Sequence, residues 1–299
     1  MAGGNGHSAL LFFSQPPQRV ISLVPSMTDS LFELGLDEAL IGVTEYCRPP
    51  GASGEHLARV GGTLTPDVER VIALQPDLVL ANQEETPRAA VEALEQAGLS
   101  VWVTFPRSVS EATSVLWAMV GLFRAAHARP RLEALEVAVD WATRASSSRA
   151  GTRVFCPIWI GETPGVGTWW MTASAGTYLS DVLAVCGGEN VFARRERRYP
   201  PEADLGLQPP EPAGDRDRRY PRVLPAEVIQ ARPDVILLPS EPWAFSGEQV
   251  RQMKDLLGDT PAVRSGRVHS IDGTLLTWHG TRLGRALAEV PSLLAPSLG

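Results

Sequence analysis

The chain has 299 residues, of which 44% are hydrophobic, so it can bury one large core or two cores of ordinary size. Its formal net charge of -7 at pH 7 argues against a nucleic-acid partner, because phosphate binding needs a dense basic face. The three cysteines, Cys47, Cys156 and Cys186, are widely spaced and form no CxxC pair. This spacing argues against a zinc or iron–sulfur site and against a disulfide scaffold, so we expect no metal site.

Residues 1–18 are predicted to form an N-terminal tail. They lack the basic start of a signal peptide, and their apolar stretch ALLFF is shorter than a signal-peptide core. No uncharged apolar run reaches the length of about 18 residues that a transmembrane helix needs. At face value the sequence predicts a cytoplasmic protein with no transmembrane segment, whereas a truncated start would instead place it in the periplasm or the cell envelope.

The first lobe is predicted over 19–129 and begins with a buried strand at 19–24, an apolar run that ends at Pro25. Ser26 and Asp29 have the spacing of a capping box for the helix that follows. A helix that starts there places backbone N–H groups at the carboxyl end of the strand, where open α/β sheets bind ligands. An ordinary βα turn accounts for the same residues equally well.

A second predicted strand, 40–44, leads into a loop that carries Tyr46. A tyrosine there suits a flat ligand, because its ring is apolar and its tip is polar; packing of the ring on Pro49 and Pro50 is the alternative. A short helix at 67–74 then presents Glu69. The rest of the lobe is predicted as a strand after Pro76-Asp77, a helix at 87–98, a strand at 101–105 and a helix at 108–127.

Residues 130–149 are predicted to form one long helix. Leu132, Leu135 and Val139 recur at the spacing of a single helical face, and the serines at the end of the segment favour termination. The position of this helix between two similar stretches of sequence makes it the expected connection between two lobes.

The similarity is clearest between VIALQPDLVLA at 71–81 and VIQARPDVILLP at 228–239, each of which predicts a short helix, a Pro-Asp turn and a buried strand. We therefore predict an α/β fold of two Rossmann-like lobes with mainly parallel sheets, the second lobe covering 150–299. A Pro-Asp turn before a hydrophobic strand is also a common feature of α/β proteins, which is the alternative explanation.

In the second lobe, residues 161–177 are rich in glycine, threonine and tryptophan and are predicted to form a long loop. A long loop that carries Trp169, Trp170 and Thr172 is expected to be functional. Residues 193–221 contain RERRYP and, 21 positions later, RDRRYP, which indicates a tandem duplication. We predict a flexible, solvated surface insertion there.

Two further aromatic loops follow predicted strands. The strand at 235–238 leads to Trp243 and Phe245, and the strand at 267–271 precedes Trp278 and His279. Aromatic faces from both lobes would sandwich a broad, planar, partly apolar ligand. The chain contains no GxGxxG, GxxxxGK[ST], HExxH or GxSxG motif, so binding without catalysis is the simpler expectation.

Six phrases of the chain, in order, resemble the cobalamin- and iron-siderophore-type substrate-binding proteins of ABC importers, a class with one long helix between two lobes and a ligand cleft between them. They are RVISLVPSMTDSLFELG, GVTEYCRPP, VGGTLTPDVERVIALQPDLVL, WWMTASAGTYLSDVLAVCGGENVF, PAEVIQARPDVILLPSEPW and RVHSIDGTLLTWHGTR. TEYC and SEPW are most similar to the cobalamin-binding branch. The resemblance therefore implies a monomeric protein that binds a corrinoid for uptake, with no catalytic residue and no resident cofactor.

By position, the resemblance implies that the ligand contacts a set of loop residues with Tyr46 as a corrin-stacking ring. This expected set is Tyr46, Trp169, Trp170, Thr172, Trp243, Phe245, Trp278 and His279. An ABC permease would dock on Glu69 of the first lobe. In the second lobe the repeat places Ala226 at the equivalent position, and Glu227 lies one residue away, rotated by about 100° on a helix.

Two other functions remain open from the sequence. An iron-siderophore or haem ligand is one, and Arg48, Arg107 and Arg282 would suit an anionic siderophore. The other is a cytoplasmic corrinoid-handling enzyme or chaperone in which His279 is a cobalt ligand or an acid–base group.

Overall fold

The computed structural model describes residues 14–148 and 150–295, so most of the predicted tail 1–18 lies outside the described residues. The chain divides into two compact units. Unit 1 comprises residues 1–106, 110–136 and 279–282, and unit 2 comprises 107–109, 137–278 and 283–299. The helix α5 (Arg129–Ser147) is continuous over 19 residues and contributes to both units.

Unit 1 is built on a five-stranded parallel sheet with the order β3-β2-β1-β4-β5. Its strands are β1 (Val20–Ser22), β2 (Leu40–Val43), β3 (Ala58–Arg59), β4 (Leu78–Asn82) and β5 (Val101–Thr104). Its helices include α1 (Pro25–Glu33), α2 (Val68–Ala73), α3 (Arg88–Gln96) and most of α4 (Val109–Leu122).

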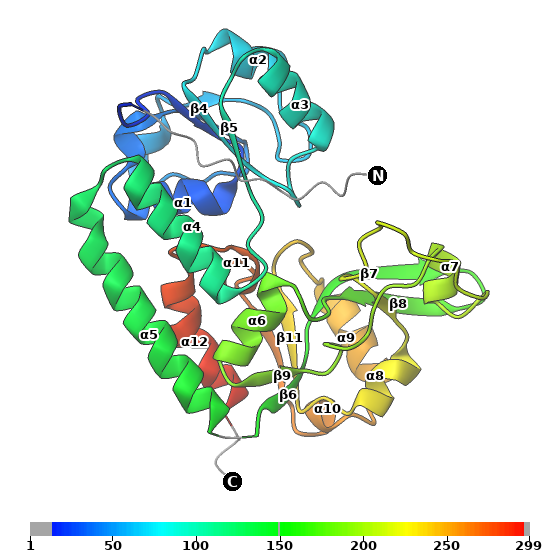
Figure 1. Ribbon diagram of the computed structural model, residues 1–299. Coiled ribbons are helices and arrows are strands. Elements are labelled where there is room, and N and C mark those ends of the chain that lie inside the picture. The colour runs from blue at the N-terminus through cyan, green and yellow to red at the C-terminus, as the bar shows by residue number, and fades with distance from the viewer. Residues whose placement is uncertain (1–13, 149, 296–299) are drawn as a thin grey trace. The chain divides into compact units, whose positions relative to one another are not determined.

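The central strands of unit 1 are covered on both faces, which is why they are apolar without interruption. Val20 and Leu80 belong to a core cluster that also contains α1 and α4 residues, whereas Ile21 and Val79 point to a second cluster with Val71 of α2 and Leu94 of α3. Figure 1 shows α2 and α3 on one side of this sheet and α1 and α4 on the other.

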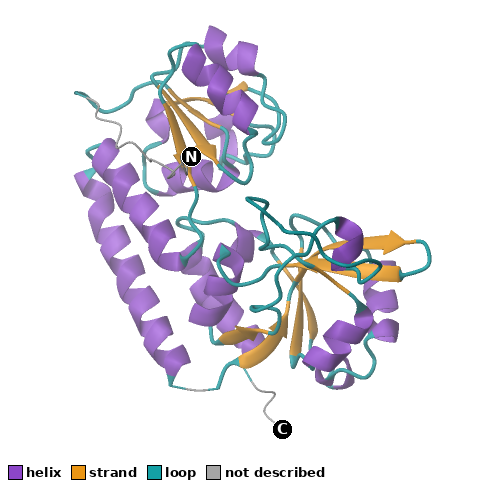
Figure 2. Cartoon of the chain, turned by 45° about the vertical axis from the view of Figure 1, so that its right-hand side comes forward, coloured by secondary structure: helices purple, strands orange, loops and turns teal. Residues whose placement is uncertain are grey.

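Unit 2 contains two sheets (Figure 2). A four-stranded parallel sheet has the order β12-β11-β6-β9, and a three-stranded antiparallel sheet has the order β10-β8-β7. The strands are β6 (Thr152–Phe155), β7 (Pro157–Thr163), β8 (Gly167–Thr172), β9 (Gly188–Asn190), β10 (Arg222–Val223), β11 (Val235–Pro239) and β12 (Val268–Ile271). The helices besides α5 are α6 (Tyr178–Val185), α7 (Pro201–Asp204), α8 (Pro225–Ala231), α9 (Gly247–Leu256), α10 (Pro261–Arg264), α11 (Thr274–Thr277) and α12 (Leu283–Leu294).

The expectation of a long loop at 161–177 is wrong, because most of this segment forms the β7–β8 hairpin. Its turn is made by Gly165 and Gly167 at φ values of 79° and 89°, which glycine adopts without strain. Along β8, buried and half-buried residues alternate with the period of two that is typical of a strand. The glycines that suggested a loop therefore mark a tight hairpin turn.

The charged insertion 193–221 is also more ordered than the sequence indicates. Its two similar copies contact each other, since the Arg197 N–H donates to the Arg218 carbonyl at 2.8 Å and the Arg218 guanidinium pairs with Glu196 at 2.8 Å. The expectation that its charges are solvated is wrong at Arg195 and Asp204, whose side chains are 12% and 0% exposed and are 2.9 Å apart. The sequence does not indicate this pairing, because Arg195 and Asp204 are in contact in the folded chain but nine positions apart in the sequence.

In the described residues, no helix combines the length and the apolar character needed to cross a membrane.

Candidate functional site

The carboxyl ends of β1, β4 and β5 in unit 1 carry a buried polar network around His279. Its Nε2 lies 3.3 Å from Asn82 Nδ2 at the end of β4 and 3.5 Å from Ser26 Oγ at the start of α1. Asn82 Nδ2 also donates to Thr104 Oγ1 at the end of β5, at 3.4 Å. Asn82 and His279 are 3% and 6% exposed, so this network is part of the interior of the unit.

The hydrogen bonds around Asn82 determine the state of His279. Asn82 Oδ1 accepts the Glu84 N–H at 2.8 Å, so the amide nitrogen faces the imidazole and donates to Nε2. Burial lowers the pKa of His279 to about 4, which keeps the ring neutral near pH 7. Because the Nε2 lone pair is already engaged, the arrangement does not favour the alternative in which His279 is a cobalt ligand or an acid–base group.

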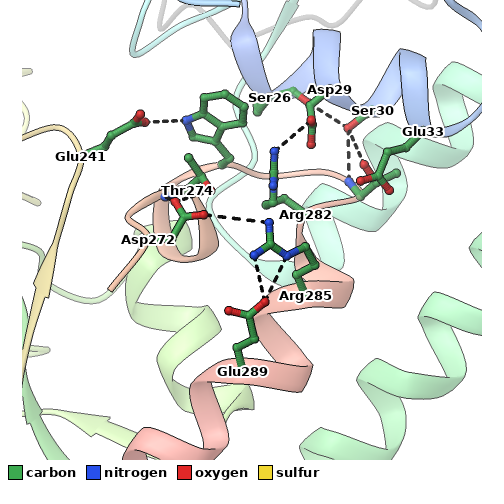
Figure 3. A network of polar contacts seen from close by, with 12 residues as sticks. Ser26, Asp29, Ser30, Glu33, Glu241, Asp272, Thr274, Arg282, Arg285 and Glu289 are labelled. Atoms are coloured by element: carbon green, nitrogen blue, oxygen red, sulfur yellow. Dashed lines mark hydrogen bonds and ion pairs between the residues drawn. The ribbon is translucent and has the colours of Figure 1, made fainter. Parts of the chain in front are cut away.

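The segment 279–282 is anchored to α1 by two further contacts. The Thr281 N–H donates to Ser30 Oγ at 3.2 Å. Arg282 pairs with Asp29 at 3.0 Å, as Figure 3 shows. The predicted capping box of Ser26 and Asp29 is therefore wrong: Val24 is the N-cap, no side chain caps the helix, and the Asp29 carboxylate binds Arg282 instead. This pairing also makes Arg282 a structural cation in unit 1.

Tyr46, in the loop after β2, is the most exposed aromatic side chain among the described residues of unit 1, with 63% of its surface exposed. A Cβ at Gly62 would lie only 3.2 Å from Tyr46 Cε2, so the glycine leaves room for the ring. A ring this exposed is not buried against Pro49 and Pro50. Its placement is compatible with contact to a flat ligand, and the stacking role stays a prediction.

In unit 2, neighbouring tryptophans on β8 face opposite sides of the small sheet. Trp170 is 0% exposed and packs edge-on against Phe155 at a centroid distance of 6.0 Å. The expectation that Trp170 faces the ligand is therefore at odds with the structure, because alternate residues on a strand point to opposite faces. Trp169 occupies the outer face, where its indole N–H donates to Thr163 Oγ1 at 3.0 Å.

The outer face of the small sheet gathers more aromatic surface than the sequence motifs indicate. The register pairs Gly161 with Trp169, and Trp159 and Arg222 each with Met171, so these residues share one face. A Cβ at Gly161 would lie 2.2 Å from the Trp169 ring, so the ring lies directly across this glycine. We call Trp159, Trp169, Met171 and Arg222, together with Trp243, the aromatic face.

Trp159 and Trp243 are the closest aromatic pair of this face. Their ring centroids are 4.3 Å apart with an interplanar angle of 55°, and Trp159 is 40% exposed. The Arg222 guanidinium carbon lies 5.0 Å from the Trp169 ring centroid, within the range of a cation–π contact. The sequence motifs did not indicate Trp159 and Arg222 as site residues. The alternation of Trp159, Gly161 and Thr163 is the period-two signal that could have identified this strand face.

The remaining residues of the expected set have mainly structural contacts. Trp278 is half-buried and its indole N–H donates to Glu241 Oε2 at 2.9 Å. Thr172 is 1% exposed and donates to the Cys156 carbonyl at 2.8 Å, and Phe245 packs on the core that contains Phe155. Trp278 and Phe245 are both half-buried in segments that follow a strand's carboxyl end, whereas Thr172 is buried.

The two candidate docking glutamates differ in their environments. Glu69 is exposed in the first turn of α2. Glu227 is half-buried: its carboxylate pairs with Arg195 at 2.9 Å and accepts the Leu224 N–H at 3.0 Å at the start of α8. Glu227 is thus engaged within unit 2, whereas Glu69 is free to contact another protein.

Among the described residues, no group of three or more His, Cys, Asp and Glu side chains is placed to hold a metal ion. The three cysteines are buried, and burial is the largest cause that raises the pKa of each thiol. The aromatic face of unit 2 offers aromatic surface and a guanidinium group, which suit the binding of a partly apolar molecule.

Comparison with known protein families identifies the family of this chain. A model described as "Periplasmic binding protein" matches residues 20–275. The chain belongs to the periplasmic binding protein family. Members of this family bind solutes, and the match spans most of both units.

The similar sequences and structures are consistent with one another. The vitamin B12-binding protein of Vibrio campbellii is 26% identical over 287 residues, which are 93% of this chain and 90% of that protein. The crystal structure of the periplasmic vitamin B12 binding protein BtuF of Vibrio cholerae has a TM-score of 0.71 at 22% identity, with 93% of this chain and 97% of that chain covered. The periplasmic heme-binding protein RhuT from Roseiflexus has a TM-score of 0.68 at 21% identity, with 93% and 97% covered. The predicted α/β fold with mainly parallel sheets and the predicted family are confirmed.

Proposed function

We propose that this protein binds a corrinoid of the cobalamin type and delivers it to an ABC permease in the cell envelope. The observation that carries this proposal is the aromatic face of unit 2, where the Trp159–Trp243 pair and Trp169 present flat apolar surface. Relatives that match along about the whole chain bear the name vitamin B12-binding protein, which supports the same ligand. We further propose that the protein acts as a monomer, without catalysis and without a resident cofactor.

The chemistry of the His279 network supports ligand binding rather than catalysis. In unit 1, His279 is neutral and its Nε2 is engaged by Asn82, and Ser26 Oγ lies 3.5 Å from the same nitrogen. A general base or an activated nucleophile needs a poised proton acceptor within reach, and this network supplies none of that kind. For the permease we propose Glu69 as the contact of unit 1, because it is the exposed member of the expected pair.

The test is calorimetric titration of the purified protein with cyanocobalamin and with cobinamide. We expect saturable binding of the corrinoids and a loss of about five- to a hundredfold in affinity in Trp243→Ala and in Tyr46→Ala, because an aromatic ring stacked on a planar ligand contributes about 1–3 kcal/mol. Trp141→Ala is the matched control: this tryptophan is 74% exposed on α5 and lies at no strand end. Its affinity should equal that of the wild type.

The failure of both corrinoids to bind would remove this proposal. The second candidate is haem or an anionic ferric siderophore such as a ferric catecholate, which the presence of Arg222 on the aromatic face favours, because the haem propionates and the ferric catecholate are negatively charged. Titration with haemin and with a ferric catecholate under the same conditions distinguishes this candidate from a corrinoid. Binding of haemin alone would assign the protein to that candidate.

A further inference from the structure

The Trp243 ring of the aromatic face is carried by a loop and not by a strand. Residues 240–246 connect β11 to α9, and Pro242, Ala244 and Ser246 in this loop are exposed. A tryptophan on such a loop has several rotamers open to it unless other groups hold it. A side chain that must be ordered when a ligand binds weakens the affinity, because the lost rotamer freedom opposes binding.

Two contacts hold the Trp243 ring. The centroid of the Trp159 ring lies 4.3 Å from that of Trp243, and the Trp243 indole N–H donates to Gln249 Oε1 at 3.3 Å. Trp243 and Gln249 are both half-buried. A contact between ring faces still allows the indole to turn in its own plane, whereas a directional hydrogen bond at Nε1 opposes this rotation. The acceptor on Gln249 therefore selects one orientation of the ring.

Gln249 is itself held in the first turn of α9. Its Oε1 accepts the Ser246 N–H at 3.0 Å, and its own backbone N–H donates to Ser246 Oγ at 3.2 Å. These reciprocal bonds form a capping box. The same Oε1 accepts from the Trp243 indole, so the ring is connected to a helix whose Met253 belongs to the core of unit 2.

Trp169 on the same face is held in a comparable way. Its indole N–H donates to Thr163 Oγ1 at 3.0 Å, and its ring lies across Gly161. An indole has a single N–H donor and no acceptor. Because the protein supplies the acceptor for this donor in Trp243 as well, Trp243 offers a ligand ring surface and not a hydrogen bond.

We propose that Gln249 is a positioning residue that holds the Trp243 ring, in the free protein, in the orientation in which it stacks on the ligand. With respect to the planar ligand the inference rests on the proposed function, whereas the orientation of the ring in the free protein does not. Ordering the ring in advance removes a cost of binding that corresponds to about two- to tenfold in affinity.

Gln249→Met is the deciding variant, because methionine is similar in length to glutamine but has no acceptor oxygen. It should weaken the binding of cyanocobalamin about two- to tenfold in calorimetric titration of the full chain. Gln249→Glu keeps an acceptor oxygen and the capping box, so it should restore the wild-type affinity.

Ser246→Ala is the matched control for the helix cap. It removes the hydroxyl that accepts the Gln249 N–H but leaves Gln249 Oε1 in place for the indole. It should lower the melting temperature about as much as Gln249→Met does, because both remove one half of the capping box, and it should bind cyanocobalamin like the wild type.

The indole N–H signals in a proton–nitrogen-15 correlation spectrum of the ligand-free protein report the ring directly. The chain has eight tryptophans, and the signal that disappears in Trp243→Phe belongs to Trp243. In Gln249→Met this signal should move upfield, because the proton loses its acceptor. In Ser246→Ala it should keep its wild-type position, and in Gln249→Glu it should stay there or move downfield.

Three results would overturn the inference. They are an unmoved Trp243 signal in Gln249→Met, wild-type affinity in Gln249→Met although the signal moves, and equal losses of affinity in Gln249→Met and Ser246→Ala, which would assign the effect to the cap of α9. A wild type that binds no cyanocobalamin counts against the proposed function instead. The Trp243 signal in Gln249→Met then still decides the positioning role: an upfield move supports it and an unmoved signal overturns it.

Discussion

At the scale of single residues, His279 shows how burial decides the chemistry of a side chain. A histidine beside a tryptophan at a strand end suggests a reactive group in the sequence, yet the ring is 6% exposed and accepts a hydrogen bond from Asn82. Its pKa falls from 6.5 to about 4 because burial disfavours the charged ring. The residue therefore supports the folded state of unit 1 and does not act as a proton donor near pH 7.

This environment predicts a pH dependence of stability. Between pH 6.5 and about pH 4 the unfolded chain binds a proton at His279 that the folded chain does not, so stability is complete above pH 6.5 and is lost as the pH falls. The difference in pKa corresponds to about 3 kcal/mol over this window. Urea unfolding from pH 7 to pH 4 should show this loss in the wild type.

Two substitutions test whether His279 causes this loss of stability at low pH. His279→Gln should flatten the decline between pH 6.5 and pH 4, because glutamine takes up no proton. His56→Gln, at an exposed position, should leave the decline unchanged. An equal slope in the wild type and in His279→Gln would show that other groups cause it.

At the scale of elements, the β8 strand separates two adjacent tryptophans that look equivalent in the sequence. Trp170 lies in the core with Phe155 and Trp169 lies on the aromatic face with Arg222. The pleat of the strand allows only one of two neighbours to face outward. A strand whose two faces differ in this way contributes both to stability and to binding through consecutive residues.

We therefore expect opposite consequences for the two alanine variants. Trp170→Ala should lower the free energy of unfolding by about 3–5 kcal/mol, because it leaves a large cavity in the core of unit 2. Trp169→Ala should cost clearly less stability and should reduce ligand affinity instead. Denaturant unfolding and calorimetric titration of both variants measure the two effects, and a similar loss of stability in both would contradict the orientation of β8.

At the scale of the whole molecule, the chain returns to unit 1 for a few residues near its C-terminus. The segment 279–282 belongs to unit 1 although unit 2 residues flank it on both sides. Within it, Gly280 has a φ of 109°, and a Cβ there would lie 2.3 Å from Ser30 Oγ. The fold of the N-terminal part of the sequence thus depends on a tight fit near the C-terminal end.

Because the chain returns to unit 1 at 279–282, we expect a substitution there to affect the N-terminal strands of that unit. Gly280→Ala should destabilise unit 1, because it adds both backbone strain and an overlap with α1. Hydrogen exchange of the β1 and β4 amides should accelerate by at least about tenfold. Gly266→Ala is the control, since Gly266 also has a positive φ, of 69°, but has open space around it. Unchanged protection in Gly280→Ala would show that 279–282 does not support unit 1.

Much of the architecture could be predicted from local sequence patterns. The apolar runs that became β1, β4, β6 and β11, and the repeated Pro-Asp phrases before two of them, indicated two α/β halves with parallel sheets. Strands that are buried on both faces must be apolar throughout, so this signal is contained in a few consecutive residues. The heptad-like spacing at 130–149 likewise predicted a long helix, which the structure places at Arg129–Ser147.

The candidate site depends on contacts between residues that are far apart in the chain. The sequence did not indicate these contacts. Strand register decided that Trp159, Trp169 and Arg222 share a face while Trp170 is buried. A salt bridge across 32 positions engaged Glu227 with Arg195, and a contact across 197 positions buried His279 against Asn82. By itself the sequence determined the family and most of the elements, with the β7–β8 hairpin as an exception, because periodicity and motifs are local. Only the tertiary structure decided which side chains remain available, since burial and pairing depend on partners that folding brings together.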